Sequence, residues 1–206
     1  HHFLRPGEEQ DGKTTLEGGD VMMVSPQHVI IGCSERTSFS GANEAMRLLV
    51  DNEVVKQVKI VEIPRRRDYM HIDTIFTQVK RHVWVLLRSL SVTESQAEME
   101  EPIAWFADKK SKDKVEIVQF RKDKKPKTFN SIEDLLANIS EKDLESSEKT
   151  QFIYSGGDIF PYNSREQWTD SCNLLALKEG VVLGYDRNDK TVEAFKEKGF
   201  AVIKVA

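Results

Sequence analysis

Apolar residues in the first 90 positions form short continuous runs that alternate with an amphipathic stretch. Residues 29–31 are aliphatic and precede a glycine, which is typical of a short buried strand. Apolar side chains between 42 and 49 then recur at helical spacing. The segment 58–63 is rich in β-branched residues and ends at Pro64, and 83–87 is a continuous apolar run of strand length. The pattern predicts an α/β fold with 83–87 as a central strand.

The middle of the chain is richer in charge. Lysine and aspartate dominate 108–127 around one alternating run at 115–120, which predicts a projecting, lysine-rich hairpin. A charged run on a hairpin is more often a solvated surface than an anion-binding patch, so we favour the first interpretation. Ser131, followed by apolar residues at helical spacing as far as Ile139, predicts a capped amphipathic helix.

Part of the pattern is repeated along the chain. The Gly-Gly-Asp sequence at 18–20 recurs at 156–158, and each copy precedes an apolar strand that ends in glycine. In both copies a polar turn with an arginine follows, then a helix and a closing strand, the second of them at 201–205. Gly199 suits the end of the second helix. Two related α/β modules explain this order, although Gly-Gly-Asp is common turn chemistry and chance similarity is the alternative.

The composition excludes several classes of protein. A net charge of −4 with a pI near 5.8 argues against a nucleic-acid partner. No apolar run approaches the roughly 20 residues needed to cross a bilayer, so we expect no membrane partner and a cytoplasmic protein. The two cysteines, Cys33 and Cys172, are too few for a disulfide framework and are expected to be thiols.

Two short segments gather residues that carry chemistry. Glu17 and Asp20 surround a glycine pair, which suits cation binding or a simple surface turn. His71 and Asp73 would project from one face if their segment were extended, because side chains alternate along a strand. A buried structural histidine is the alternative for His71. A metal site is not expected, since it needs three or more ligands and no further histidine or cysteine cluster supplies them.

Taken together, the motifs of this chain resemble those of arginine deiminases, in the same order along the sequence. The motifs that carry the resemblance are 16–21 (LEGGDV), 34–38 (SERTS), 70–76 (MHIDTIF), 165–168 (REQW) with Asn173, and 180–188 (GVVLGYDRN). The match is patchy from 89 to 150. The chain is expected to be an internal piece of such an enzyme.

The resemblance implies the pentein fold, a five-bladed α/β propeller. The chain would form an incomplete propeller of about three blades, with the lysine-rich hairpin as an insertion. We expect a single arginine-deiminase-like domain fragment over 1–206. Its blade-like modules would lie at about 14–88 and 151–206, with a connector at about 89–150.

The resemblance also implies roles for individual residues in converting L-arginine to citrulline and ammonia. Asp73 would hold the substrate guanidinium, whose planar fork of donors fits a carboxylate. His71 would be the general acid and base, and Glu17 would orient it. Asp20 resembles a further substrate-binding carboxylate of the family site, and Arg36 resembles the arginine that pairs with the substrate's α-carboxylate. No cofactor and no metal are implied.

The chain departs from the family pattern in two respects. It has no counterpart of the family's C-terminal nucleophilic cysteine, because Cys33 and Cys172 stand in other contexts, and it lacks a second guanidinium-binding aspartate upstream. We therefore expect the nucleophile outside these 206 residues and no activity from them alone. Another guanidine substrate, or a catalytically silent pentein-type binding or scaffold protein, is the alternative. The sequence leaves open whether the protein forms a homo-oligomer.

Overall fold

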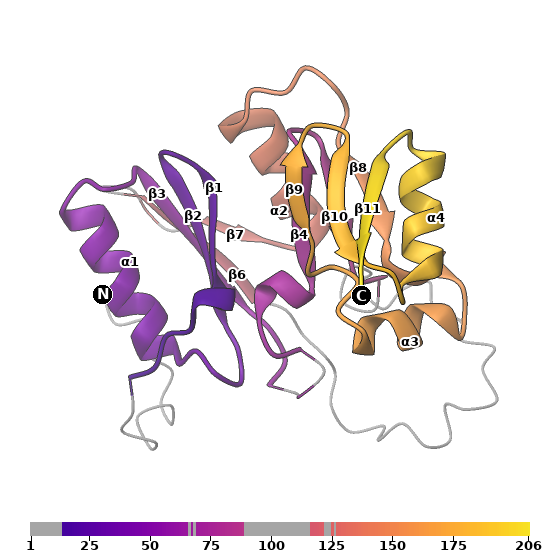
Figure 1. Cartoon of the computed structure of the whole chain (residues 1–206). Coiled ribbons are helices and arrows are strands. Elements are labelled where there is room, and N and C mark those ends of the chain that lie inside the picture. Colours follow the sequence, from indigo (N-terminus) through magenta and orange to yellow (C-terminus); the bar gives the residue numbers. More distant parts are fainter. Residues whose placement is uncertain (1–13, 66, 68, 89–115, 122–124, 126) are drawn as a thin grey trace.

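The computed structural model describes residues 14–65, 67, 69–88, 116–121, 125 and 127–206. These residues form one five-stranded and two three-stranded sheets. In Figure 1 the five-stranded sheet lies on the left and the two three-stranded sheets lie on the right, and helices accompany each of them. The structure thus confirms the predicted α/β class.

The five-stranded sheet comes first. Its strand order is β1 (Val21–Ser25), β2 (His28–Cys33), β3 (Gln57–Glu62), β6 (Glu116–Arg121), β7 (Lys127–Phe129). Helix α1 (Phe39–Asp51) connects β2 to β3, and the Ser38 side chain caps it by accepting a hydrogen bond from the Gly41 amide. The predicted hairpin is therefore present as β6 and β7. It does not project, because β6 pairs antiparallel with β3 along its whole length.

The two smaller sheets occupy the other half of the molecule. The second sheet has the order β4 (Phe76–Lys80), β5 (Val83–Leu86), β8 (Gln151–Tyr154), which confirms the central position expected for 83–87. The third sheet has the order β11 (Ala201–Val205), β10 (Val181–Tyr185), β9 (Leu175–Lys178). The helices of this half are α2 (Ile132–Asn138), which continues into a π-helical turn η5 (Ile139–Asp143), α3 (Tyr162–Trp168) and α4 (Asp189–Glu197).

One plan of strand pairing recurs in all three sheets. The first strand pairs antiparallel with the second, and the second pairs parallel with a third that follows a helix. The helices in these three connections are α1, α2 and α4. The sequence pattern predicted two such modules, and the structure adds β4, β5 and β8 as another example.

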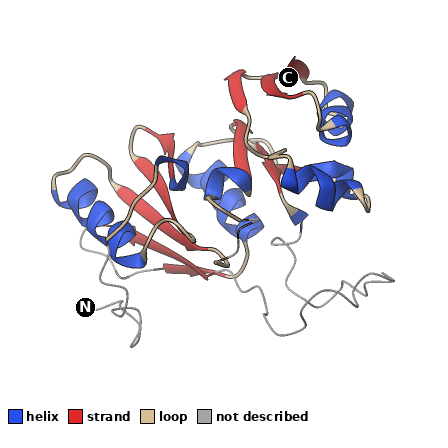
Figure 2. Ribbon diagram, turned by 60° about the horizontal axis from the view of Figure 1, so that its bottom comes forward, coloured by secondary structure: helices blue, strands red, loops and turns tan. Residues whose placement is uncertain are grey.

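The core consists of two clusters of buried side chains. The larger cluster joins all three sheets with α2 and α4, and includes Ile30, Val61, Phe76, Trp84, Leu135, Val182 and Phe195. Trp84 is fully buried, packs edge-on against Phe76, and its indole N–H donates to Ser140 Oγ at 2.9 Å. Helix α2 lies between the first and second sheets (Figure 2).

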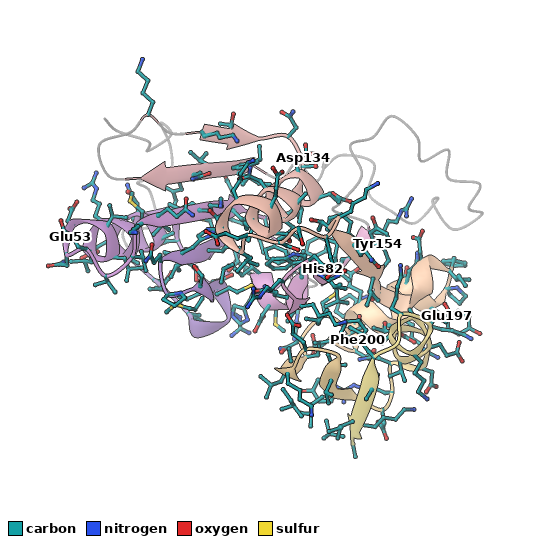
Figure 3. All side chains as sticks on the ribbon, turned by 90° about the horizontal axis from the view of Figure 1, so that it is seen from above. Glu53, His82, Asp134, Tyr154, Glu197 and Phe200 are labelled. Carbon is teal, nitrogen blue, oxygen red and sulfur yellow. The ribbon has the colours of Figure 1, made fainter. Side chains whose placement is uncertain are left out.

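The smaller cluster lies between α1 and the other face of the first sheet. Ile30 faces the larger cluster while Val29 and Ile31 face α1, so β2 is buried on both faces. This explains why 29–31 is continuously apolar instead of alternating. Seen from above, α1 near Glu53 and the third sheet near Phe200 lie at opposite ends of the molecule (Figure 3). No helix in the described part of the chain is both long and apolar enough to span a membrane.

Candidate functional site

The candidate residues lie in two tight turns that pack against each other. The 3-10 turn Gly18–Asp20 leads into β1, and the 3-10 turn Ile72–Thr74 leads into β4. The condition under which alternation would place His71 and Asp73 on one face is not met, because Ile72–Thr74 forms a 3-10 turn that follows His71 in an extended conformation. His71 and Asp73 still lie together, with 3.9 Å between Nδ1 and Oδ1, because the turn brings both side chains to one side.

Glu17 holds the far side of the His71 ring. Its Oε2 lies 2.8 Å from His71 Nε2, and the imidazole is 18% exposed. The hydrogen bond with His71 is the main cause that lowers the pKa of the Glu17 carboxyl; burial opposes it, and the charge of nearby Arg36 lowers the pKa further. An ionised Glu17 can only accept in this bond, so the proton lies on Nε2, and the other ring nitrogen, Nδ1, lies on the side of Asp73.

Asp73 is a carboxylate in a poorly solvated position. Its Oδ1 is shielded from solvent and has no hydrogen-bond partner among the described residues. Burial raises the pKa of the Asp73 carboxyl, His71 lowers it in part, and the negative charges of Asp20 and Asp170 raise it further. A cationic group placed against this oxygen would relieve the cost of its charge.

Arg36 lies at the exposed side of the same group. Its Nη1 is 3.4 Å from Glu17 Oε2 and its Nη2 donates to Met70 Sδ at 3.6 Å. About half of the Arg36 side chain is exposed, so its guanidinium remains accessible to an anion. The structure therefore brings together four of the five residues that the sequence singled out, from the turn after β2 and the turns before β1 and β4.

The fifth residue, Asp20, lies beneath this group and is fully buried. One carboxylate oxygen accepts from Ser34 Oγ at 2.6 Å and the other accepts from the Ile72 amide at 3.1 Å. The sequence analysis did not single out Ser34. Its signal was its position directly after a buried strand and two residues before Arg36.

The glycine pair allows the two turns to approach closely. A Cβ atom on Gly19 would lie 2.6 Å from His71 Nδ1, well inside contact distance. Only glycine leaves room for the imidazole here, so Gly19 has a steric reason to be glycine.

Neither cysteine lies on the exposed side of the site. Cys33 is 2% exposed and belongs to the cluster against α1. Cys172 is fully buried, and burial raises the pKa of its thiol well above the usual range. Within the described ranges, no group of three or more histidine, cysteine, aspartate or glutamate side chains could hold a metal ion.

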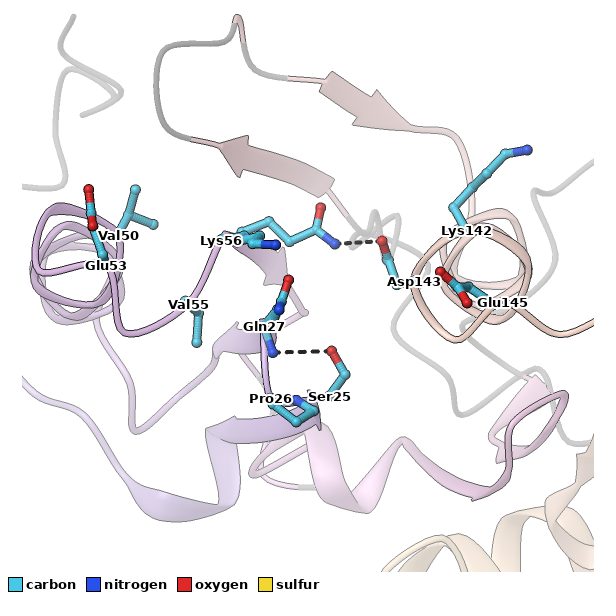
Figure 4. Close-up of a pocket in the computed structure, with 11 residues that line it drawn as sticks. Ser25, Pro26, Gln27, Val50, Glu53, Val55, Lys56, Lys142, Asp143 and Glu145 are labelled. Carbon is cyan, nitrogen blue, oxygen red and sulfur yellow. Dashed lines mark hydrogen bonds between the residues drawn. The ribbon is translucent and has the colours of Figure 1, made fainter.

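A cavity of about 850 Å³ lies away from these residues, between the β1–β2 turn, the α1–β3 connection and the end of α2 (Figure 4). Its charged lining side chains are of both signs: Glu53, Lys56, Lys142, Asp143 and Glu145. This mixture singles out no class of ligand.

The fold is similar to that of amidinotransferases. An amidinotransferase of the saxitoxin biosynthetic pathway from Microseira wollei matches with a TM-score of 0.53 at 16% identity, over 91% of this chain and 41% of that one. The inosamine-phosphate amidinotransferase of Streptomyces griseus matches with a TM-score of 0.50 at 11% identity, over 94% of this chain and 42% of that one. The chain thus has a mixed α/β fold that is similar to the fold of these amidinotransferases.

Sequence comparison narrows the assignment. The family model for arginine deiminase matches residues 3–206. The arginine deiminases of Staphylococcus aureus (strain MRSA252) and Staphylococcus haemolyticus (strain JCSC1435) are each 30% identical to this chain over 96% of its length. The chain belongs to the arginine deiminase family. It spans 44% of the length of these relatives.

Proposed function

We propose that the protein hydrolyses the guanidinium group of L-arginine to citrulline and ammonia. The observation that carries the proposal is the assembly of Glu17, His71 and Asp73, with Arg36 beside them. A carboxylate-bound imidazole next to a poorly solvated carboxylate suits proton transfer at a bound cation. The S. aureus and S. haemolyticus relatives are arginine deiminases, which supports this substrate class.

Asp73 is the proposed guanidinium ligand. Its side chain is 31% exposed, and the exposed part of the carboxylate would accept a charge-assisted hydrogen bond from the substrate guanidinium. The raised pKa of the Asp73 carboxyl supports this role, because a bound cation would favour the charged form that burial disfavours.

His71 is the proposed general acid and base, with the nucleophile supplied by a cysteine outside these 206 residues. The cysteine thiolate would bond to the guanidinium carbon, and a C–N bond would then break as His71 Nδ1 gives its proton to the departing ammonia. His71 would next take a proton from water, whose oxygen bonds to the same carbon. Release of the thiolate leaves citrulline. Glu17 would hold the imidazole throughout and stabilise its charged form.

Arg36 is the proposed partner of the substrate's α-carboxylate. It now contacts Glu17 at 3.4 Å, an ion pair that is long and about half exposed and therefore weak. A substrate carboxylate could offer the guanidinium a better, bidentate partner. This favours L-arginine over a guanidine without a carboxylate.

For the larger architecture, we propose that 1–206 is one domain fragment of a five-bladed propeller with about three blades, in which about 14–88 and 151–206 are blade-like modules and about 89–150 is a connector. The recurring strand plan supports this count. Apolar side chains exposed on the third sheet also support further packing partners there: Leu175, Leu177 and Ile203. We further propose that the protein acts in the cytoplasm without a cofactor.

The test is citrulline formation from L-arginine by the full product of the reading frame, beside His71→Ala, Asp73→Asn and the 206-residue chain. Glu35→Gln is the matched control, because Glu35 adjoins Arg36 but is exposed and outside the assembly. We expect loss of His71 to reduce kcat/KM by about 10²–10⁴-fold, the usual range for general acid–base catalysis. We expect Glu35→Gln to retain activity.

Two outcomes would contradict the proposal. Citrulline from the 206-residue chain alone would disprove the external cysteine. No turnover of L-arginine, agmatine or methylated arginines by the long protein would favour the silent scaffold, and turnover of agmatine in preference to arginine would contradict the role of Arg36.

A further inference from the structure

The Ser34 hydroxyl is the centre of a buried hydrogen-bond network. Ser34 is 2% exposed and lies directly after β2. Its Oγ donates to Asp20 Oδ2 at 2.6 Å and accepts from the amides of Arg36 and Thr37, each at 3.1 Å. A serine hydroxyl has one donor and two acceptor positions, so these three bonds use its full capacity.

Asp20 carries this network to the second turn. Its remaining oxygen accepts from the backbone amide of Ile72 at 3.1 Å, and Ile72 stands between His71 and Asp73. Both Asp20 and Ile72 are fully buried, so water cannot replace the bond. The position of the His71–Asp73 turn relative to β2 therefore depends on one carboxylate.

Thr37 extends the network to the loop that bears Glu17. The Glu17 amide donates to Thr37 Oγ1 at 3.1 Å, and the Ser34 amide donates to the Thr37 carbonyl at 3.1 Å. Glu17, Arg36 and the His71–Asp73 turn are thus all tied to the same four-residue segment after β2.

We propose that Ser34 and Asp20 are positioning residues that hold Glu17 against His71 and set the place of Asp73. We call the hydrogen-bond network of Ser34, Asp20 and Thr37 the brace. The effect of the brace on catalysis rests on the proposed function, whereas the existence of the brace does not. In this role Asp20 acts through the Ile72 backbone and not through contact with substrate, unlike the role that the family resemblance implies.

The saturated Ser34 hydroxyl makes Asp20→Asn a sharp test. Asparagine has the size of aspartate but offers one oxygen and one NH₂ group. If its NH₂ faces Ser34, the hydroxyl has no acceptor position left, and if it faces the Ile72 amide, two donors oppose each other. Either orientation loses one link of the brace without creating a cavity.

The experiment uses the 206-residue chain and needs no turnover. We would compare Asp20→Asn and Ser34→Ala with Ser25→Ala, which removes a hydroxyl from the β1–β2 turn of the same sheet. The readouts are the ¹⁵N signals of the His71 ring and the titration of the Glu17 carboxyl by ¹³C NMR, with circular dichroism to follow folding.

We expect both brace variants to weaken the Glu17–His71 hydrogen bond. The pKa of the Glu17 carboxyl should then rise toward its ordinary value of 4.5, because that bond is the main cause of its lowering. Ser34→Thr keeps the hydroxyl and should restore the parent signals, and Ser25→Ala should not change them. Unchanged His71 and Glu17 signals in folded Asp20→Asn and Ser34→Ala would overturn the proposal.

A kinetic arm in the full reading-frame product separates this inference from the proposed function. A misplaced imidazole should lower kcat by roughly 10–10²-fold while KM for L-arginine changes little. Altered NMR signals in a protein without deiminase activity would uphold the brace and reject the proposed function. Normal kcat in Asp20→Asn, with deiminase activity present, would reject the brace.

Discussion

Glu166 supplies the N-terminal cap of α4 from a distant position in the chain. It is fully buried, and its carboxylate accepts from the amides of Lys190 and Thr191 at 2.9 Å each and from Thr191 Oγ1 at 2.7 Å. Asn188 occupies the usual capping position, but its amide group donates instead to the Thr169 carbonyl. Glu166 therefore satisfies helix amides that would otherwise be buried without an acceptor, and its charge complements the helix dipole.

We expect Glu166→Gln to lower the free energy of unfolding by about 2–3 kcal/mol. Glutamine keeps one oxygen, which can serve the two Thr191 donors, but its NH₂ group must then face the Lys190 amide. The variant loses the hydrogen bond from the Lys190 amide to a charged acceptor, worth about 1.5–3 kcal/mol. It also loses the ion pair between Arg165 Nη2 and the same oxygen at 2.8 Å, which adds little because Arg165 is half exposed, and the attraction of the charge to the helix end adds a few tenths.

The assay is equilibrium unfolding in urea, with Asp189→Asn as the matched control. Asp189 also places a carboxylate in the first turn of α4, but its side chain is 65% exposed and pairs with Lys204 only at 3.6 Å. We expect the control to change stability by less than about 0.5 kcal/mol, as is usual for surface changes. A loss below about 1 kcal/mol for Glu166→Gln, or equal losses for both variants, would show that the cap is not what Glu166 contributes.

Two further predictions concern the site and the contact between α2 and the first sheet. Gly19→Ala should displace the His71 ring, because the new Cβ would lie 2.6 Å from Nδ1. We expect roughly 10²-fold loss of arginine turnover in the long protein with little loss of stability. Unchanged kcat/KM would contradict this prediction. Burial alone would raise the pKa of the Asp143 carboxyl, but hydrogen bonds from His28 and Lys59 outweigh burial and hold that pKa below its ordinary 3.8. This contribution to stability is present above about pH 4 and is lost as the pH falls further, so the unfolding free energies of the parent and Asp143→Asn should converge in acid; parallel pH profiles would refute it.

The elements that the sequence predicted well are those with a strong local signal. The strand at 83–87 and the helices after Ser38 and Ser131 have continuous apolar runs or capping serines within a few residues. Strand β8 escaped prediction because it pairs with β5 across the long segment between them. Pairing between distant segments leaves no periodicity in either one, so only three-dimensional structure reveals the third module.

In the candidate site, too, local sequence signals were predicted well and contacts between distant segments were not. Glycines and charged side chains at short spacing pointed to the two turns, and the structure brings those turns together. The sequence analysis considered an extended conformation for this segment, but Ile72–Thr74 is a 3-10 turn. Alternation was the wrong reason for placing His71 near Asp73, because a tight turn gives the same proximity. Ser34 escaped notice because a hydroxyl's partners are set by tertiary contacts, which residue type does not encode.

Asp73 shows how the charges of the site are balanced. Burial raises the pKa of its carboxyl above the ordinary 3.8, so the folded chain binds this proton more tightly than the unfolded chain does. The stabilisation that results from binding this proton is complete only at a pH below the ordinary pKa of 3.8, and it is lost as the pH rises. An ionised Asp73 therefore opposes folding at neutral pH. Arg36 does not relieve this cost, since it contacts Glu17 and Met70. Under the proposed function, a bound guanidinium would remove the free-energy cost of keeping Asp73 ionised. The relief of that cost would then contribute to the affinity for substrate.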